Sequence, residues 1–280
     1  MIGRPLTPGG VDGFKAVEAR IGSPSANQGL VWDRYLPLWS GYDSRPSMNG
    51  GGMTLKRALD DLVKRHKDAE KQAAAWMKER LARRQRALEQ LEQNTGRTLR
   101  VIKLRTQGRF ATGLGADHPS ENGFSFDPTT GLPVIAGSGI KGLCRRAAVL
   151  QGAREEDCLR WFGPETIAAD TDAGCGSVTF FDALPTAWPR LAVDIINNHH
   201  SDYYVGKGKG KDQVRRGPPV TANPVPVYFL TVEKGAEFSF ALLGPAEDVE
   251  AMEEILRLGA EWLGLGAKTA AGYGRLDPVP

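Results

Sequence analysis

Residues 54–93 contain neither glycine nor proline, and this uninterrupted stretch constrains the fold more than any other feature of the sequence. Apolar residues recur in it at steps of three and four, first from Leu55 to Trp76 and then from Met77 to Leu91. Such spacing places apolar side chains along one face of an α-helix. We therefore expect one helix about 60 Å long or a hairpin of two helices. Docking on its own domain is the favoured interpretation, and projection toward a partner is the alternative.

Positive charge is concentrated in two segments, although the net charge of the chain is only +3. Residues 54–93 hold 11 Lys or Arg against 7 Asp or Glu, a net charge of +4. The glycine-rich stretch 206–217 also carries +4, from Lys207, Lys209, Lys211, Arg215 and Arg216 against Asp212. Such a loop can clamp the phosphates of a nucleic acid, because cationic contacts dominate affinity. A merely solvated surface loop is the equally weighted alternative.

Glycine is enriched, with 34 residues in 280, which is about 12% against a usual ~7%. The excess is too small for a disordered, low-complexity chain, so the glycines punctuate a fold. They cluster at 108–115, 131–142, 206–217 and 264–274. We interpret these clusters as places where backbone N–H groups can approach RNA phosphates.

Beyond residue 96 the sequence alternates between short strands and helices. We expect strands at 99–105, 177–181, 225–232, 237–243 and 273–277, and helices at 138–150, 155–162 and 246–263. Residues 233–236 would join two of the strands as a hairpin, and Ser138 would cap the first helix. With one edge strand set aside, the order matches the β-α-β-β-α-β pattern of a ferredoxin-like α+β fold. That fold also underlies the RRM, a common RNA-binding module.

These patterns predict a single domain in three parts: an irregular segment at 1–53 that packs its aromatic residues on the body, a helical insertion at 54–95, and a ferredoxin-like core at 96–280. No apolar run approaches the ~20 residues that span a bilayer, and the N-terminus lacks an apolar signal core. Three cysteines without a Cys-x-x-Cys pair indicate neither a disulfide framework nor a zinc ribbon. A cytoplasmic location is therefore expected.

Two glycine-rich segments carry the main candidates for RNA-backbone contact. One is the expected helix start at 137–142, where free N–H groups and the helix dipole attract anions. The other is the loop 264–274. The candidate side chains are Lys141, Arg145, Arg146, Lys268, Thr269, Tyr273 and Arg275, and the candidate backbone positions are Gly137, Gly139, Gly264, Gly266, Gly272 and Gly274. A capped helix with solvated cations and a sharp helix-to-strand connection are the structural alternatives.

Histidine side chains can act as acid/base groups or as metal ligands. His118 lies in a loop flanked by glycines, and we favour loop ordering or RNA contact because no second base stands beside it. His66 falls on the apolar stripe of the long helix and is interpreted as structural. The adjacent His199 and His200 would point apart on a helix or a strand. No metal or cofactor site is predicted.

Several segments together resemble the RAMP superfamily of CRISPR–Cas proteins, and within it the family of the sixth subunit of the type III-B (Cmr) effector complex. The segments are 27–35 (NQGLVWDRY), 112–115 running through 118–123 (HPSENG), 135–143 (IAGSGIKGL), 161–163 (WFG), 176–182, 194–226 ending in NPVP, and 264–274. They span nearly the whole chain except the 54–93 helix.

The resemblance implies a ferredoxin-like fold without catalysis of its own and a role in antiviral defence. Such a subunit would contact guide CRISPR RNA and target RNA near the guide 3′ end. It would also contact neighbouring Cmr subunits on both sides, and no membrane. Two alternatives stay open: a metal-independent RNA endonuclease that uses His118 as general acid/base, and a protein-interaction module that uses the 54–93 helix.

Overall fold

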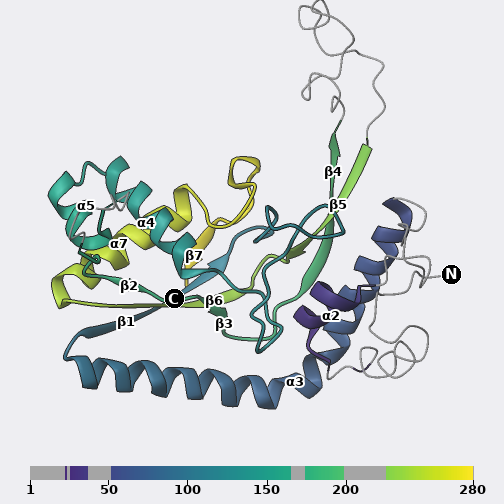
Figure 1. Cartoon of the computed structure of the whole chain (residues 1–280), viewed down its shortest axis with the longest axis horizontal. Helices are drawn as coiled ribbons and strands as arrows, with labels where there is room; N and C mark the ends of the chain where they lie inside the picture. The colour runs from purple at the N-terminus through teal and green to yellow at the C-terminus, as the bar shows by residue number, and fades with distance from the viewer. Residues whose placement is uncertain (1–22, 24–25, 37–51, 165–173, 199–224, 280) are drawn as a thin grey trace, which may run out of the picture.

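The computed structural model describes residues 23, 26–36, 52–164, 174–198 and 225–279. The fold is α+β, with two antiparallel sheets and helices packed around them (Figure 1). In chain order the elements are α2 (Gln28–Tyr35), α3 (Gly52–Thr95), β1 (Thr98–Thr106), α4 (Gly137–Leu150), α5 (Glu155–Phe162), β2 (Thr179–Phe180), β3 (Leu184–Pro185), β4 (Leu191–Asn198), β5 (Val225–Val232), β6 (Glu237–Gly244), α7 (Ala246–Trp262), the 3-10 turn η2 (Thr269–Ala271) and β7 (Leu276–Pro278).

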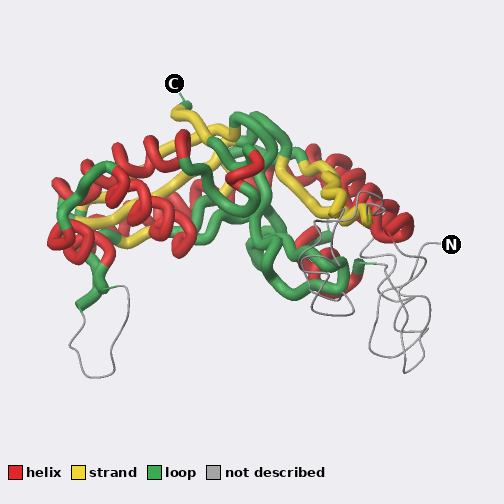
Figure 2. Tube along the Cα trace, turned by 90° about the horizontal axis from the view of Figure 1, so that it is seen from above, coloured by secondary structure: helices red, strands yellow, loops and turns green. Residues whose placement is uncertain are grey.

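The main sheet has the strand order β2-β6-β1-β7, and β3 pairs with β6 as well. β1 lies at its centre, antiparallel to both β6 and β7. Figure 1 shows α4 and α7 on one side of this sheet and α3 on the other. Figure 2 shows the second sheet, β4–β5, at the other end of the molecule beside the first half of α3.

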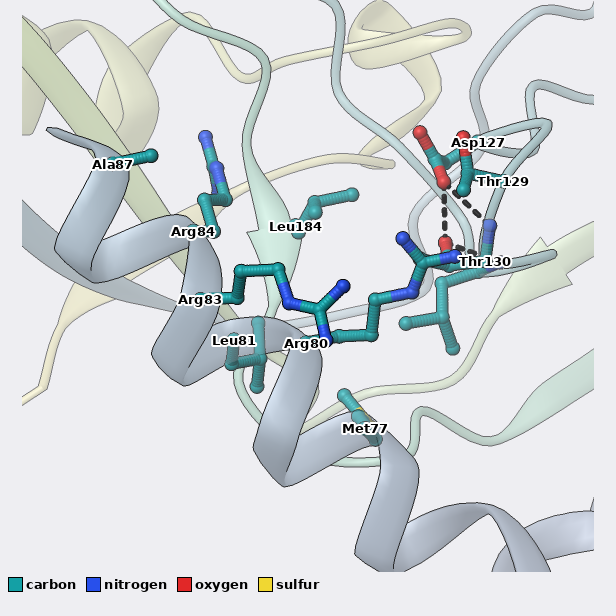
Figure 3. Close-up of a pocket in the computed structure, with 11 residues that line it drawn as sticks. Met77, Arg80, Leu81, Arg83, Arg84, Ala87, Asp127, Thr129, Thr130 and Leu184 are labelled. Carbon is teal, nitrogen blue, oxygen red and sulfur yellow. Dashed lines mark hydrogen bonds between the residues drawn. The ribbon is translucent and has the colours of Figure 1, made fainter.

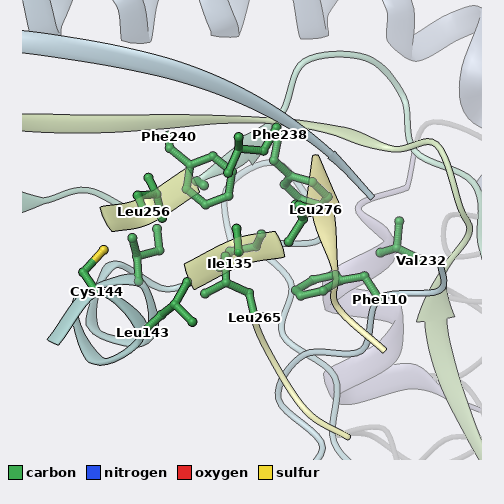
Figure 4. Close-up of a cluster of buried hydrophobic side chains, with 14 of the residues drawn as sticks. Phe110, Ile135, Leu143, Cys144, Val232, Phe238, Phe240, Leu256, Leu265 and Leu276 are labelled. Atoms are coloured by element: carbon green, nitrogen blue, oxygen red, sulfur yellow. The ribbon is translucent and has the colours of Figure 1, made fainter. Parts of the chain in front are cut away.

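The core forms where the strands alternate between apolar and polar side chains. In β1, Ile102 and Leu104 are buried while Lys103 and Arg105 are exposed, which is the period of two that a half-buried strand requires. Phe238 and Phe240 of β6, Leu143 of α4, Leu256 of α7 and Leu276 of β7 belong to the same buried cluster (Figure 4).

α3 is one continuous helix of 44 residues, so the single-helix prediction is confirmed and the helical hairpin is wrong. Docking on the same chain is also confirmed. Its buried positions follow the predicted stripe, with Leu59, Leu62, Ala69, Ala73 and Met77 all nearly inaccessible to solvent. The stripe packs against β4 and β5.

The expected hairpin of β5 with β6 is wrong. β5 pairs with β4, a strand that sequence reasoning missed, whereas β6 pairs with β1. The connection at 233–236 is bound by Thr106 at the end of β1. The amide of Gly235 donates to the Thr106 carbonyl at 2.9 Å, and the amide of Ala236 donates to Thr106 Oγ1 at 3.0 Å. These bonds direct the chain from one sheet to the other, so the two strands do not fold back on each other.

The segment 106–111, which we call the junction, links both sheets. The amide of Phe110 donates to the carbonyl of Val232 at 2.9 Å, and the amide of Val232 donates back to Phe110 at 2.7 Å. Phe110 itself is fully buried. The junction thus attaches β5 to the end of β1.

Other differences from the expected elements are local. Residues 28–35, expected to be irregular, form α2, because the Asn27 side chain accepts a hydrogen bond from the amide of Leu30 at 3.0 Å and caps the helix. The aromatic packing expected for this region is confirmed at Trp32, which is 2% exposed. β2 is shorter than the predicted strand at 177–181. β7 begins three residues later than the predicted strand at 273–277.

His66 connects α3 to the segment before β4 and is structural, as predicted. It is fully buried, its Nε2 lies 2.7 Å from the carbonyl of Pro189, and its ring stacks on Trp188. The Trp188 indole in turn donates to the His66 carbonyl at 2.8 Å. Burial lowers the pKa of His66 to about 4, and the bond to Pro189 opposes this only in part.

We expect the stability of the protein to depend on pH through His66. Unfolded His66 takes up a proton below its ordinary pKa of 6.5, whereas folded His66 stays neutral until about pH 4. The free energy of unfolding should therefore fall by about 3 kcal/mol as the pH drops across this window. Urea unfolding of wild type and His66→Asn at pH 7 and near pH 4 measures this. An equal pH dependence in the two proteins would contradict the assignment.

Candidate nucleic-acid interface

The loop 264–274, which follows α7 and leads into β7, is folded tightly onto the junction. The amide of Ala267 donates to the carbonyl of Ala111 at 2.7 Å, and the amide of Gly274 donates to the carbonyl of Arg109 at 3.0 Å. Gly266 and Gly274 have positive φ, and a Cβ atom at either would collide with a backbone carbonyl oxygen, of Ala111 and Leu265 respectively. These two glycines are therefore required for close packing within the protein.

Lys268 and Thr269 form the tip of this loop. Lys268 has a left-handed backbone with φ of 59°, and its Nζ lies 5.2 Å from the centre of the Phe229 ring of β5. This is a cation–π distance. Both side chains remain partly exposed, so the tip presents a cation and a hydroxyl group beside the β4–β5 sheet.

Tyr273 ties the same loop to β4 through a shared carboxylate. Its hydroxyl group donates to Asp194 Oδ2 at 2.7 Å, and Arg109 Nη1 lies 2.7 Å from the same oxygen. Although burial acts to raise the pKa of Asp194, the bonds from Tyr273 and Arg109 lower it overall. Burial and then Asp194 raise the pKa of Tyr273 to about 12.

Arg109 was missed by the sequence analysis. It stands next to Gly108 in a glycine cluster, which was the only local signal, and its partner Asp194 is far away in the sequence. The Arg109 side chain is 43% exposed, so it adds an accessible cation beside Lys268.

Arg275 is bound to its own chain. Its Nη1 donates to the carbonyl of Glu261 at 2.8 Å and to that of Trp262. These are among the last carbonyls of α7, which carry the negative end of the helix dipole. Arg275 therefore stabilises the end of α7.

The start of α4 already holds an anion from its own chain. Ala136 is the N-cap residue, so the predicted Ser138 cap is wrong. The amide of Gly137 donates to Asp182 Oδ1 at 2.7 Å, and a Cβ atom at Gly137 would collide with the Phe180 carbonyl. The Asp182 carboxylate thus takes the position that we expected a phosphate to occupy.

Beside this helix start lies a cavity of about 390 Å³. Ser138 and Lys141 of α4 line it together with Phe162, Thr179 and Phe180. The walls carry a cation, two hydroxyl groups and two aromatic rings, which are the groups that bind phosphates and stack on bases.

The other basic residues of α4 have different roles. Arg145 Nη2 donates to the carbonyl of Gly163 at 2.7 Å, and its guanidinium lies over the Phe162 ring. It therefore holds the end of α5. Arg146, the next residue of α4, is exposed to solvent. α4 packs on α5 and α7.

His118 orders its loop against α2. Its ring stacks on Trp32 with centroids 4.1 Å apart, its Nε2 lies 3.0 Å from the Trp32 carbonyl, and its Nδ1 lies 2.6 Å from Ser120 Oγ. Burial lowers the pKa of His118. Both ring nitrogens are engaged within the protein, as expected of a histidine that orders a loop.

Some predicted residues fall outside the described ranges: Lys207, Lys209, Lys211, Arg215 and Arg216, and also His199 and His200. Within the described residues, no group of three or more His, Cys, Asp or Glu side chains could hold a metal ion. In that same part of the chain, no helix has the length and apolar character needed to cross a bilayer.

We expect Tyr273 to ionise about two pH units above an ordinary tyrosine, whose pKa is 10.0. Because the folded pKa is raised, its contribution to stability is complete below pH 10 and is lost as the pH rises toward 12. Absorbance titration of the tyrosines should show the shifted component, which should be absent in Tyr273→Phe and should move toward pH 10 in Asp194→Asn. A titration curve that Asp194→Asn leaves unchanged would exclude this coupling.

Comparison with known proteins gives consistent relatives. The chain is 32% identical over 229 residues to the CRISPR system Cmr subunit Cmr6 of Pyrococcus furiosus, covering 62% of this chain and 66% of that protein. It is 30% identical over 156 residues to Cmr6 of Saccharolobus solfataricus, covering 55% and 47%. The matched regions thus span less than two thirds of the length of each relative.

The fold is also found in solved structures. A chain of a cryo-EM structure of the Type III-B Cmr-beta bound to cognate target RNA matches with a TM-score of 0.57 and 20% identity, covering 95% of this chain and 86% of that chain. A family model described as the RAMP superfamily matches residues 101–277. That range is more than half of the sequence, and the chain belongs to the RAMP superfamily.

Proposed function

We propose that this chain is a non-catalytic, RNA-binding subunit of a type III-B CRISPR (Cmr) effector complex that acts in antiviral defence in the cytoplasm. Its partners would be guide CRISPR RNA near the guide 3′ end, target RNA and neighbouring Cmr subunits. The observation that carries the proposal is the 32% identity with a Cmr6 subunit over 229 residues. The absence of a disulfide among Cys144, Cys158 and Cys175 is compatible with a reducing compartment.

We also infer that residues 96–280 form a ferredoxin-like core with 54–95 as a helical insertion and 1–53 as an N-terminal extension. The strand order β2-β6-β1-β7, with every pairing antiparallel, supports this topology. In it, α4 follows the first strand and α7 precedes the last. The β4–β5 pair is then an addition between the second and third strands.

Two accessible regions would contact the RNA backbone. One is the cavity at the start of α4, with Ser138 and Lys141, to which we add the exposed Arg146 of the same helix. The other is the tip of the 264–274 loop, with Lys268 and Thr269 beside Arg109. We keep the 206–217 loop as a further clamp on the strength of its charge. Arg145, Tyr273 and Arg275 support these regions through bonds to their own chain.

We expect Lys141→Ala and Lys268→Ala each to weaken binding of single-stranded RNA by roughly threefold to tenfold, since each removes one charged contact. The dependence of log affinity on log salt should lose ~0.7 in slope per variant. Fluorescence anisotropy over a salt series measures both quantities. Lys67→Ala removes an exposed cation of α3 and serves as the matched control. Equal affinity and slope in all four proteins would contradict the assigned interface.

The absence of catalysis is tested separately. Because both ring nitrogens of His118 are engaged by Trp32 and Ser120, we expect guide-precursor RNA to remain intact when incubated with the purified protein in EDTA. Gel analysis of labelled RNA measures this. Specific cuts that disappear in His118→Ala would establish the endonuclease alternative instead.

A further inference from the structure

A groove lies between α3 and the loop 127–132 (Figure 3). α3 lies on the opposite side of the main sheet from α4 (Figure 1). The volume of the groove is about 260 Å³. On the α3 side it is lined by Arg80, Arg83 and Arg84, and we call it the arginine groove. Arg83 and Arg84 are three and four residues beyond Arg80, so all three side chains start from one face of the helix.

Arg80 extends from α3 toward the loop that contains Thr130, whereas Arg83 lies along the helix at the rim of the groove (Figure 3). Arg83 Nη2 lies 2.8 Å from Glu79 Oε1, and both side chains are 66% exposed. An ion pair this exposed contributes little, so an incoming anion can replace it. Arg80 is also exposed.

Arg84 closes one end of the groove. It donates to the carbonyl of Asp182 and so fixes α3 to the body. Burial lowers the pKa of Arg84, against the opposing effect of Asp182 and Asp127. An arginine still keeps its proton at neutral pH, so Arg84 adds fixed positive charge at the wall of the groove.

The opposite wall offers little competing negative charge. Among the described residues that line the groove, Asp127 is the only carboxylate. Its Oδ1 accepts hydrogen bonds from the amide of Thr130 at 2.7 Å and from Thr130 Oγ1 at 2.6 Å. Below the arginines, Met77 and Leu132 form an apolar floor and are almost completely buried. The groove therefore combines cationic donors at its rim with an apolar base.

We propose that the arginine groove binds a phosphodiester of a single-stranded RNA segment, with Arg80 and Arg83 donating to the phosphate and the apolar floor contacting the sugar or base. All three cations are arginines, whose planar forks match phosphate oxygens and whose faces stack on bases. This rests on the proposed RNA-binding function and adds a contact on the other side of the sheet. An acidic protein segment is the competing occupant.

The test compares two variants of the full chain that lose the same charge from the same helix. Arg80→Gln/Arg83→Gln removes the rim of the groove, and Lys78→Gln/Arg86→Gln removes two exposed cations of α3 that do not line it. Fluorescence anisotropy with a labelled single-stranded RNA should show roughly tenfold weaker binding and a salt slope smaller by ~1.4 for the groove variant, with little change for the control. Photo-crosslinking of thiouridine RNA should label the peptide that contains residues 127–132, and thermal melting verifies that each variant is folded.

Each outcome separates this proposal from the function that it extends. One outcome is that Lys141→Ala weakens RNA binding, whereas the groove variant binds RNA as well as its control variant and no crosslink falls in 127–132. The groove proposal is then overturned, and the proposed function stands. If wild type binds no RNA, both fail. If the groove variant binds RNA normally but no longer assembles with other Cmr subunits, the groove binds protein and the proposal is overturned.

Discussion

The backbone of the junction, residues 106–111, is the connection on which the rest of the structure depends. Thr106 binds the link between β5 and β6, Phe110 pairs with Val232, and the carbonyls of Arg109 and Ala111 accept bonds from the 264–274 loop. Because these partners come from two distant parts of the sequence, 232–236 and 264–274, one extended segment fixes both sheets and the loop relative to one another. Phe110 fills the space between them and is fully buried. The positions of Arg109 and Lys268 therefore follow from how the core is connected.

Several glycines of the glycine-rich segments have a structural role. At Gly137, Gly266 and Gly274 a side chain would collide with backbone carbonyl oxygens. Several nearby amides already donate within the protein, to Asp182 at the start of α4 and to residues 109–111 at the loop. Glycine thus brings backbone segments into contact, and the cationic side chains beside it remain as the groups available for a phosphate. At these three positions, glycine is therefore required for packing within the protein.

Elements with strong local patterns could be predicted from the sequence, and those that depend on distant partners could not. The stripe of α3, the strands β1, β5 and β6, and α7 were all expected because periodicity and end signals are local. β4 was not expected because it carries a charged residue, Asp194, in mid-strand. The Asp194 carboxylate is stabilised there by Arg109 and Tyr273, which are distant in the sequence. The pairing of β5 with β4, and the capping of α4 by Asp182, likewise depend on contacts between distant residues. Among the site residues, Lys141 and Lys268 were predictable from composition, whereas Arg109 and the arginine groove required the fold.

The central pairing of the main sheet has a consequence for how the chain reaches this fold. Ile102 of β1 lies opposite Phe240 of β6, so the two central strands, which pair in space, are separated in the sequence by most of the core. During synthesis, β1 leaves the ribosome long before β6 or β7 exists, and closing so long a loop slows folding. α3, whose contacts are local along the helix, can form at once. Unpaired β1 edges are prone to aggregation until the C-terminal strands arrive. Loss of the chain from β6 onward would therefore remove the central partner of β1, whereas loss of β7 alone would remove an edge strand.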